Sequence, residues 1–206
     1  MRAPLPVAYL SGISAMTPGS AITVLRALIK RLAKHDAAFD EYVDKPLLVK
    51  SRDGYWFYAR PRAPDLYTIA VSERYELEKW FKPRARGLVI DVGAYIGTYT
   101  VRACNKAEKV VAVEPHPANY TALKINVAMN CPRRNAVLIN KALGAASGRG
   151  YLWTPLGSRG VGLTTAALKS SKQRSVRYEV EIDTLDNLLE ELGLGSDAVN
   201  YLKIDV

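Results

Sequence analysis

One short stretch, from Leu88 to Thr100, constrains the fold of this chain more than any other part of the sequence. It reads L-V-I-D-V-G-A-Y-I-G-T-Y-T. Its first residues are aliphatic without alternation, which is typical of a central strand buried on both faces. Gly93 and Gly97 follow, and glycine tolerates the positive φ angles of a tight turn and lets the backbone approach a ligand closely. The pattern predicts a buried strand with a carboxylate at Asp91, then a glycine turn and a helix.

The spacing of the two glycines indicates which ligand this turn serves. A dinucleotide site requires G-x-G-x-x-G and a P-loop requires G-x-x-x-x-G-K-[ST], and neither occurs here. A second apolar run, Lys109–Val113, ends in Glu114. An acid at the end of the second strand, roughly 20 residues after the glycine turn, is placed to accept hydrogen bonds from ribose hydroxyls. The ligand is expected to carry a ribose but no pyrophosphate, and S-adenosylmethionine meets that description.

Four motifs in order carry a resemblance to a known family. They are V-I-D-V-G-A-Y-I-G-T-Y-T, A-V-E-P-H-P-A-N-Y, I-N-K-A-L-G and L-K-I-D-V. Between about Leu47 and Val206 the chain resembles the FkbM-type S-adenosylmethionine-dependent methyltransferases. That family usually has Asn where this chain has Tyr95. It also normally continues K-I-D-V with E-G and further helices and strands, so the resemblance implies a domain truncated after Val206.

The expected fold is α/β, with a doubly wound, Rossmann-like methyltransferase sheet that is incomplete at the C-terminus. Parallel strands are predicted at 88–92, 109–113, 136–140 and 200–206, and ligands of such sheets bind beyond the carboxyl ends of the strands. The residues expected to bind S-adenosylmethionine follow those ends: Asp91, Gly93, Ala94, Tyr95, Ile96, Gly97, Thr98, Glu114, Pro115, Asn140 and Lys141.

Asp205, at the end of the last predicted strand, is the candidate catalytic residue. Methyl transfer depends mainly on alignment of donor and acceptor, and a hydroxyl acceptor also benefits from a base. Asp205 is expected near Asp91 and Glu114 because the carboxyl ends of adjacent parallel strands meet at one edge of the sheet. The alternative is that Asp205 only orients the cofactor or caps a turn. No metal site is predicted.

Three regions are expected along the chain. Residues 1–44 are interpreted as a loose arm followed by a basic amphipathic helix from Ala21 to Lys34. Residues 45–86 are a hairpin and helical lead-in, since Asp53-Gly54 between two apolar runs is a strong hairpin signal. Residues 87–206 form the cofactor-binding core. The basic helix is expected to pack on its own domain or a partner, or to lie on a membrane surface. Its expected packing face consists of Ile22, Leu25, Leu28, Ile29 and Leu32.

The net charge of +9 is unevenly distributed. Between Tyr151 and Tyr178 there are five basic residues and no acidic one. Such a stretch is a solvated loop or a surface for an anionic substrate, nucleic acid or membrane. No aromatic residue lies among the cations between Lys169 and Arg177, so a specific nucleic-acid site is not expected.

The two cysteines and the hydropathy pattern indicate a compartment. Cys104 and Cys131 form no C-x-x-C pair, and we expect two small buried or half-buried side chains in a reducing compartment. No apolar run approaches the roughly 18 residues of a membrane span, and the N-terminus lacks a convincing signal peptide. A cytoplasmic protein without a transmembrane segment is expected.

The predicted function is O-methylation of a hydroxyl on a sugar, lipid or secondary metabolite, so the acceptor is expected to be a small molecule or glycan. Two alternatives stay open. The chain is a non-catalytic S-adenosylmethionine-binding remnant or a half-domain that needs a partner chain, or it is a basic nucleic-acid-binding protein. A sheet that ends at Tyr201–Val206 exposes an apolar edge. We therefore expect a complementing chain or a homo-oligomer at that edge.

Overall fold

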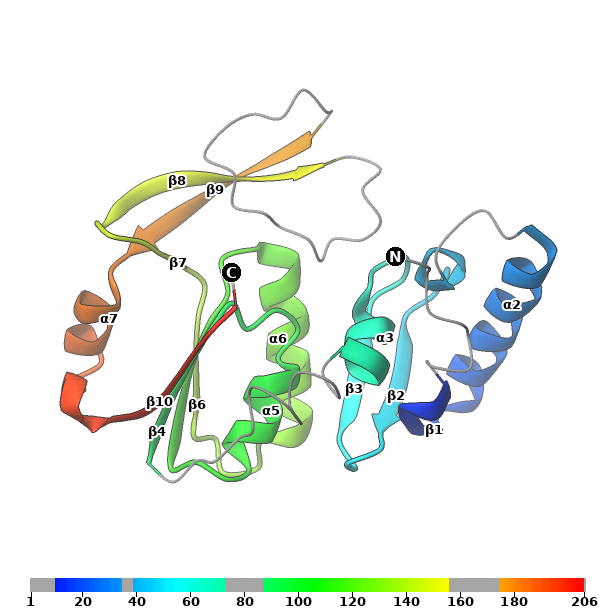
Figure 1. Cartoon of the computed structure of the whole chain (residues 1–206), viewed down its shortest axis with the longest axis horizontal. Helices are drawn as coiled ribbons and strands as arrows, with labels where there is room; N and C mark the ends of the chain where they lie inside the picture. Colours follow the sequence, from blue (N-terminus) through cyan, green and yellow to red (C-terminus); the bar gives the residue numbers. More distant parts are fainter. Residues whose placement is uncertain (1–9, 35–38, 73–86, 156–174, 206) are drawn as a thin grey trace. The chain divides into compact units, whose positions relative to one another are not determined.

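The computed structural model describes residues 10–34, 39–72, 87–155 and 175–205 (Figure 1). These residues belong to two compact units. The N-terminal unit contains residues 10–34 and 39–72, and the C-terminal unit contains residues 87–155 and 175–205. Residues 73–86 of the expected lead-in lie outside the described part, as do Arg159, Lys169, Lys172 and Arg174 of the basic stretch.

A three-stranded antiparallel sheet forms the centre of the N-terminal unit, in the order β1-β2-β3. The strands are β1 (Ile13–Met16), β2 (Leu47–Ser51) and β3 (Trp56–Ala59). The predicted hairpin is confirmed: β2 pairs with β3, and Gly54 in the turn has a φ of 96°. The loose arm predicted for the first 20 residues is wrong at β1, which pairs with β2. A four-residue strand is too short for periodicity to reveal.

Helix α2 (Pro18–Lys34) packs on this sheet through small side chains rather than large ones. Val24 and Ala27 are buried, and the Ser20 hydroxyl, at the start of the helix, accepts a hydrogen bond from the Leu48 backbone N–H at 2.8 Å. Leu28 is half-buried. The rest of the predicted face, formed by Ile22, Leu25, Ile29 and Leu32, is exposed and does not pack on its own unit, so the alternatives of a partner or a membrane surface stay open. Short helical turns, η1 (Phe39–Tyr42), α3 (Asp65–Tyr67) and η2 (Thr68–Ser72), complete the unit.

The C-terminal unit contains a four-stranded, all-parallel sheet in the order β10-β4-β5-β6. The strands are β4 (Leu88–Val92), β5 (Lys109–Val113), β6 (Ala136–Ile139) and β10 (Val199–Ile204). Helices α5 (Thr98–Cys104) and α6 (Pro117–Asn130) lie on one face, and α7 (Leu185–Glu191) lies on the other (Figure 1). The predicted doubly wound α/β fold is confirmed.

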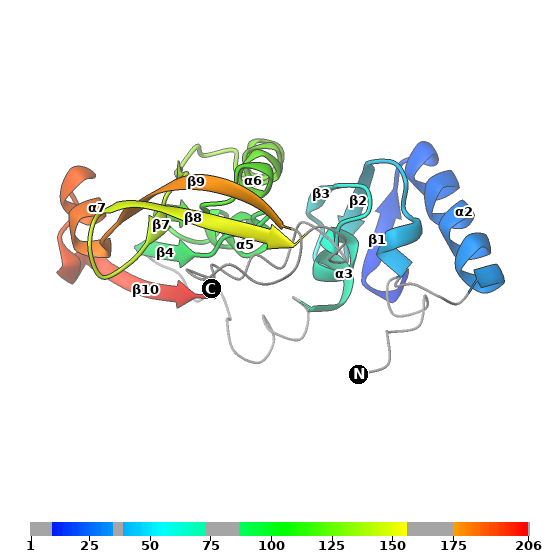
Figure 2. The same cartoon turned by 90° about the horizontal axis from the view of Figure 1, so that it is seen from above.

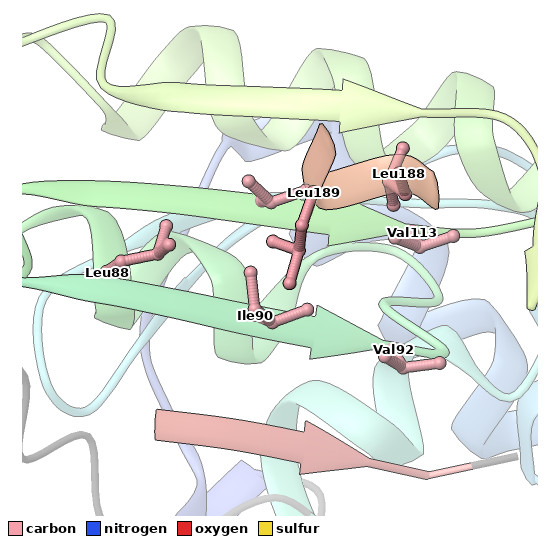
Figure 3. Close-up of a cluster of buried hydrophobic side chains, with 7 residues drawn as sticks. Leu88, Ile90, Val92, Val113, Leu188 and Leu189 are labelled. Carbon is pink, nitrogen blue, oxygen red and sulfur yellow. The ribbon is translucent and has the colours of Figure 1, made fainter. Parts of the chain in front are cut away.

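The core of this unit explains why polar and apolar residues do not alternate along β4. Leu88, Ile90 and Val92 point toward Leu188 and Leu189 of α7 (Figure 3). The alternating side chains of Val89 and Asp91 point to the opposite face, which helices also cover, so every residue of β4 is buried. Continuous apolar sequence is what a parallel strand covered on both faces requires.

A smaller three-stranded sheet has the order β7-β9-β8 (Figure 2). Its strands are β7 (Ala142–Leu143), β8 (Gly148–Pro155) and β9 (Ser175–Asp183). β9 pairs in parallel with β7 and antiparallel with β8. The rings of His116 and Tyr178 meet edge to face with centroids 4.6 Å apart, so β9 packs next to the start of α6.

Cys104 at the end of α5 and Cys131 at the C-cap of α6 form a disulfide. The prediction of two unlinked side chains is therefore wrong. Their spacing of 27 residues carries no signal, because only the packing of α5 beside α6 brings the two positions together. Disulfides are rare in reducing compartments. The cytoplasmic location stays a prediction, and this pair argues against it. Among the described helices, none combines the length and hydrophobicity needed to cross a bilayer.

Removing this disulfide is expected to lower the free energy of unfolding by about 2–4 kcal/mol, because the unfolded chain regains the freedom of the closed loop. Urea unfolding of the oxidised chain and of Cys104→Ser/Cys131→Ser measures the difference. Reductant should destabilise the parent chain and leave the double variant unchanged. Two thiols that react with a thiol reagent in the native, oxidised chain would contradict the pairing.

Candidate functional site

The glycine turn between β4 and α5 contains three residues with positive φ. Gly93, Tyr95 and Gly97 have φ angles of 74°, 54° and 85°. A Cβ atom at Gly97 would lie 2.5 Å from Cδ1 of Leu123, so both the backbone angle and the space require glycine there. Positive φ is uncommon for a side chain as large as Tyr95, and Asn tolerates it better. The FkbM-type family, which the sequence resembles, usually has Asn at this position.

Hydrogen bonds from neighbouring elements hold the turn. The backbone N–H groups of Gly93 and Ala94 both donate to the Val113 carbonyl at 3.0 Å. The Asn126 side-chain amide donates to the Ile96 carbonyl at 2.8 Å. Of the predicted turn residues, Ala94, Ile96, Gly97 and Thr98 are buried, whereas Gly93 and Tyr95 are half-buried. Within the turn, these last two are the residues that solvent reaches.

Glu114 joins the glycine turn to helix α6. Its side chain is buried, and its Oε2 accepts a hydrogen bond from the Tyr95 backbone N–H at 2.9 Å. Its Oε1 accepts hydrogen bonds from the His116 backbone N–H at 2.9 Å and from Asn119 Nδ2 at 3.1 Å. The acid that the sequence analysis placed at the end of β5 therefore also fixes the turn that it faces.

Asp91 lies behind the turn rather than at its surface. Its carboxylate is fully buried, forms an ion pair with Lys203 Nζ at 2.9 Å and accepts a hydrogen bond from Thr100 Oγ1 at 2.5 Å. Lys203 Nζ also lies 3.3 Å from the Gly93 carbonyl oxygen. This ion pair links β4 to β10 and positions the first residue of the turn. The structure thus gives Asp91 an anchoring contact within the protein.

Asn140 and Lys141 follow β6 but point to different surroundings. Asn140 Nδ2 donates to the carbonyl oxygens of Glu114 at 2.7 Å and Pro115 at 3.0 Å, so Asn140 belongs to the same edge as the turn. Lys141 Nζ instead lies 2.9 Å from both Glu181 and Asp183. These carboxylates raise the pKa of Lys141, and Lys141 in turn lowers the pKa of Asp183. The Lys141 ammonium therefore links the segment between β6 and β7 to β9.

Asp205 follows β10 at the other side of the turn. Its backbone N–H donates to the Val92 carbonyl at 3.0 Å, and its side chain is 60% exposed. Its Oδ2 lies 3.9 Å from Lys203 Nζ. Asp205, the turn, Glu114 and Asn140 therefore occupy one continuous edge, where β10, β4, β5 and β6 all end.

The residues that hold this edge in place were not predicted from the sequence: Thr100, Asn119, Asn126 and Lys203. One signal for Lys203 was present. A buried carboxylate is costly unless it is paired, so Asp91 required a cation. Lys203 is the only cation in the four predicted parallel strands apart from Lys109, which begins its strand. The amides carried no comparable signal.

The family-model comparison matches the methyltransferase FkbM domain over residues 91–206, which includes the turn, Glu114, Asn140 and Asp205. This chain belongs to the FkbM methyltransferase family. None of the curated protein sequences compared with this FkbM chain matches it.

Several solved methyltransferase structures are similar to parts of the FkbM chain. The methyltransferase FkbM from Methylobacillus flagellatus has 15% identity and a TM-score of 0.40, covering 64% of this chain and 30% of its own. Trm5b from Pyrococcus abyssi has 18% identity and a TM-score of 0.39, covering 56% and 43%. A putative S-adenosylmethionine-dependent methyltransferase from Listeria monocytogenes has 15% identity and a TM-score of 0.30, covering 58% and 78%. The FkbM chain thus spans less than a third of the length of the first of these proteins.

Proposed function

We propose that this chain binds S-adenosylmethionine at the edge formed by the turn, Glu114 and Asn140, and that it methylates a hydroxyl oxygen of a sugar, lipid or secondary metabolite. The observation that carries the proposal is the Glu114 carboxylate, which ends β5 and holds the Tyr95 N–H of the glycine turn at 2.9 Å. An acid at the end of the second strand, beside a glycine turn, is placed to bind ribose hydroxyls, and the lack of G-x-G-x-x-G disfavours a pyrophosphate.

The residues at this edge fit the chemical groups of S-adenosylmethionine. Glu114 supplies carboxylate oxygens that accept hydrogen bonds from ribose hydroxyls. The backbone around Gly93 and Tyr95 is the half-buried part of the turn and suits the amino-acid tail. The side-chain amide of Asn140 suits the adenine edge, because an amide carries both an acceptor and donors. The bound cofactor supplies a methyl group on a positively charged sulfonium.

Asp205 is the proposed base for the acceptor hydroxyl. Its carboxylate is exposed at the end of β10, so an acceptor that approaches this edge reaches it from solvent. Lys203, buried next to Asp91, fixes the strand that carries Asp205. In this arrangement Asp205 takes the hydroxyl proton while the edge aligns donor and acceptor.

Transfer of a labelled methyl group from S-adenosylmethionine to a panel of sugars, glycolipids and hydroxylated metabolites tests this function. Asp205→Asn is expected to lower kcat about 10²–10⁴-fold with unchanged affinity for S-adenosylmethionine, because only proton removal is affected. Asp197→Asn, at an exposed aspartate in the turn before β10, is the matched control and should keep full activity. Full activity of Asp205→Asn would assign Asp205 to orientation or capping instead.

A half-domain that binds S-adenosylmethionine and needs a complementing chain is the second candidate. It is favoured by the edge strand β10, where Leu202 and Ile204 are 40% and 56% exposed within the described residues. Apolar side chains on an open edge strand invite a neighbouring strand. The same assay separates the two candidates, since a half-domain binds the cofactor but transfers no methyl group until its partner is added.

A further inference from the structure

Helix α2 has apolar residues on two opposite sides. The inner side, which packs on the sheet of the N-terminal unit, buries Thr23, Val24 and Ala27. The other side carries an outer stripe that consists of Ile22, Leu25, Ile29 and Leu32. Spacings of three and four residues place these side chains next to one another along one line of the helix. Figure 2 shows α2 beside β1, with one side turned away from the strands of its unit.

The outer stripe is too exposed to belong to the core of its own unit. Its four side chains are between 53% and 65% exposed, and they are the most exposed large hydrophobic residues in α2. Single exposed apolar residues are ordinary, but a contiguous row of four on one helix marks an interaction surface. The stripe is aliphatic throughout, so it offers no ring for stacking and suits an apolar, fluid partner.

Charge indicates the chemistry of that partner. Helix α2 contains Arg26, Lys30, Arg31 and Lys34 and has no acidic residue. Arg26 and Lys30 directly follow the stripe residues Leu25 and Ile29, and both are exposed. Lys30 forms one exposed ion pair, with Asp44 at 2.8 Å, which contributes little energy in water. The surroundings of the stripe are therefore cationic, and they complement an anionic surface.

We infer that α2 docks on an anionic lipid surface, with the outer stripe inserted among the acyl chains and the exposed Arg26 and Lys30 at the level of the headgroups. A helix that lies in the plane of a membrane combines an aliphatic face with lysines and arginines beside it, as α2 does. The inner side stays packed on the sheet of the N-terminal unit, so docking requires no unfolding. This inference does not depend on the proposed methyl transfer.

A second copy of the helix is a poorer partner for the same stripe. Two such helices packed stripe to stripe would bring Arg26 and Lys30 of one copy next to cations of the other, and like charges beside an apolar seam oppose pairing. Helix α2 itself has no acidic residue to offset that repulsion, and the exposed pair between Lys30 and Asp44 offsets only part of it. An anionic bilayer satisfies both the stripe and the cations.

Sedimentation of the full chain with vesicles tests the inference. Binding is expected to vesicles of phosphatidylcholine with a quarter phosphatidylglycerol, and to be much weaker with phosphatidylcholine alone or at high salt. Leu25→Ser/Ile29→Ser is expected to lower the partition coefficient at least about tenfold, because two inserted side chains are lost. Arg26→Gln/Lys30→Gln should lower it several-fold and remove most of the salt dependence.

Ile125→Ser is the matched control, because Ile125 is an exposed aliphatic residue on α6 in the other unit and should not affect binding. Unchanged unfolding transitions in all variants are expected, since the altered side chains are exposed. The inference is overturned if the anionic vesicles fail to sediment the chain, if the serine variant binds as well as the parent, or if light scattering shows a dimer that depends on Leu25 and Ile29.

Discussion

Lys203→Met is expected to lower the free energy of unfolding by about 3–5 kcal/mol, which is the typical cost of leaving a buried charge without its partner. Asp91 is fully buried, and Lys203 Nζ lies 2.9 Å from its carboxylate. Of the described partners of the Asp91 carboxylate, only the Thr100 hydroxyl would still donate a hydrogen bond after the substitution. Because Lys203 also contacts the Gly93 carbonyl, the turn should loosen at the same time. Urea unfolding of both chains measures the difference.

The double variant Asp91→Asn/Lys203→Met distinguishes a lost ion pair from lost packing. Removing both charges should recover much of the stability, since no uncompensated charge is then buried. Lys106→Met, at an exposed lysine just after α5, is the matched control and should stay within about 0.5 kcal/mol of the parent. Equal losses for Lys203→Met and Lys106→Met would show that the buried pair contributes little.

Glu114→Gln is expected to weaken binding of S-adenosylmethionine at least about tenfold, because a hydrogen bond to a charged acceptor contributes about 1.5–3 kcal/mol. The amide has only one acceptor oxygen, whereas the carboxylate uses both oxygens to hold Tyr95, His116 and Asn119. The substitution therefore affects the ribose contact and the shape of the turn together. Calorimetric titration of the parent and the variant gives the change in Kd.

Two further variants isolate the contact with the cofactor. Asn119→Ala removes one hydrogen bond to Glu114 but keeps the carboxylate, so it should lose stability with a much smaller change in Kd. Glu108→Gln changes an exposed glutamate near the opposite end of β5 and should bind normally. A Glu114→Gln chain that unfolds cooperatively and binds with the parent Kd would exclude Glu114 from the cofactor site.

Local patterns explain why much of the fold could be predicted from the sequence. Continuous aliphatic runs are the signature of parallel strands covered on both faces, and all four strands of the parallel sheet were predicted from them. The glycine turn was predicted because positions with a positive φ angle favour glycine. Glu114 was found by its place after β5. Each of these signals lies within a few residues of the feature that it predicts.

Contacts between residues far apart in the sequence gave no local signal from which they could be predicted. Asp91 and Lys203 are 112 residues apart and meet only because β10 lies beside β4 in the sheet. Cys104 and Cys131 meet because two helices pack together. In α2, periodicity located the apolar residues but not the side that packs on the sheet. The smaller Val24 and Ala27 allow the closer approach, which leaves the large residues outside.

Calorimetric titration of the chain with S-adenosylmethionine is the most direct test of the cofactor site at the edge of β4, β5 and β6. We expect saturable binding of one molecule per chain, weakened in Glu114→Gln and retained in Glu108→Gln. Circular dichroism and a cooperative unfolding transition on the same sample establish that the chain is folded. A folded chain that releases or absorbs no heat and shows no thermal stabilisation with S-adenosylmethionine would contradict the account.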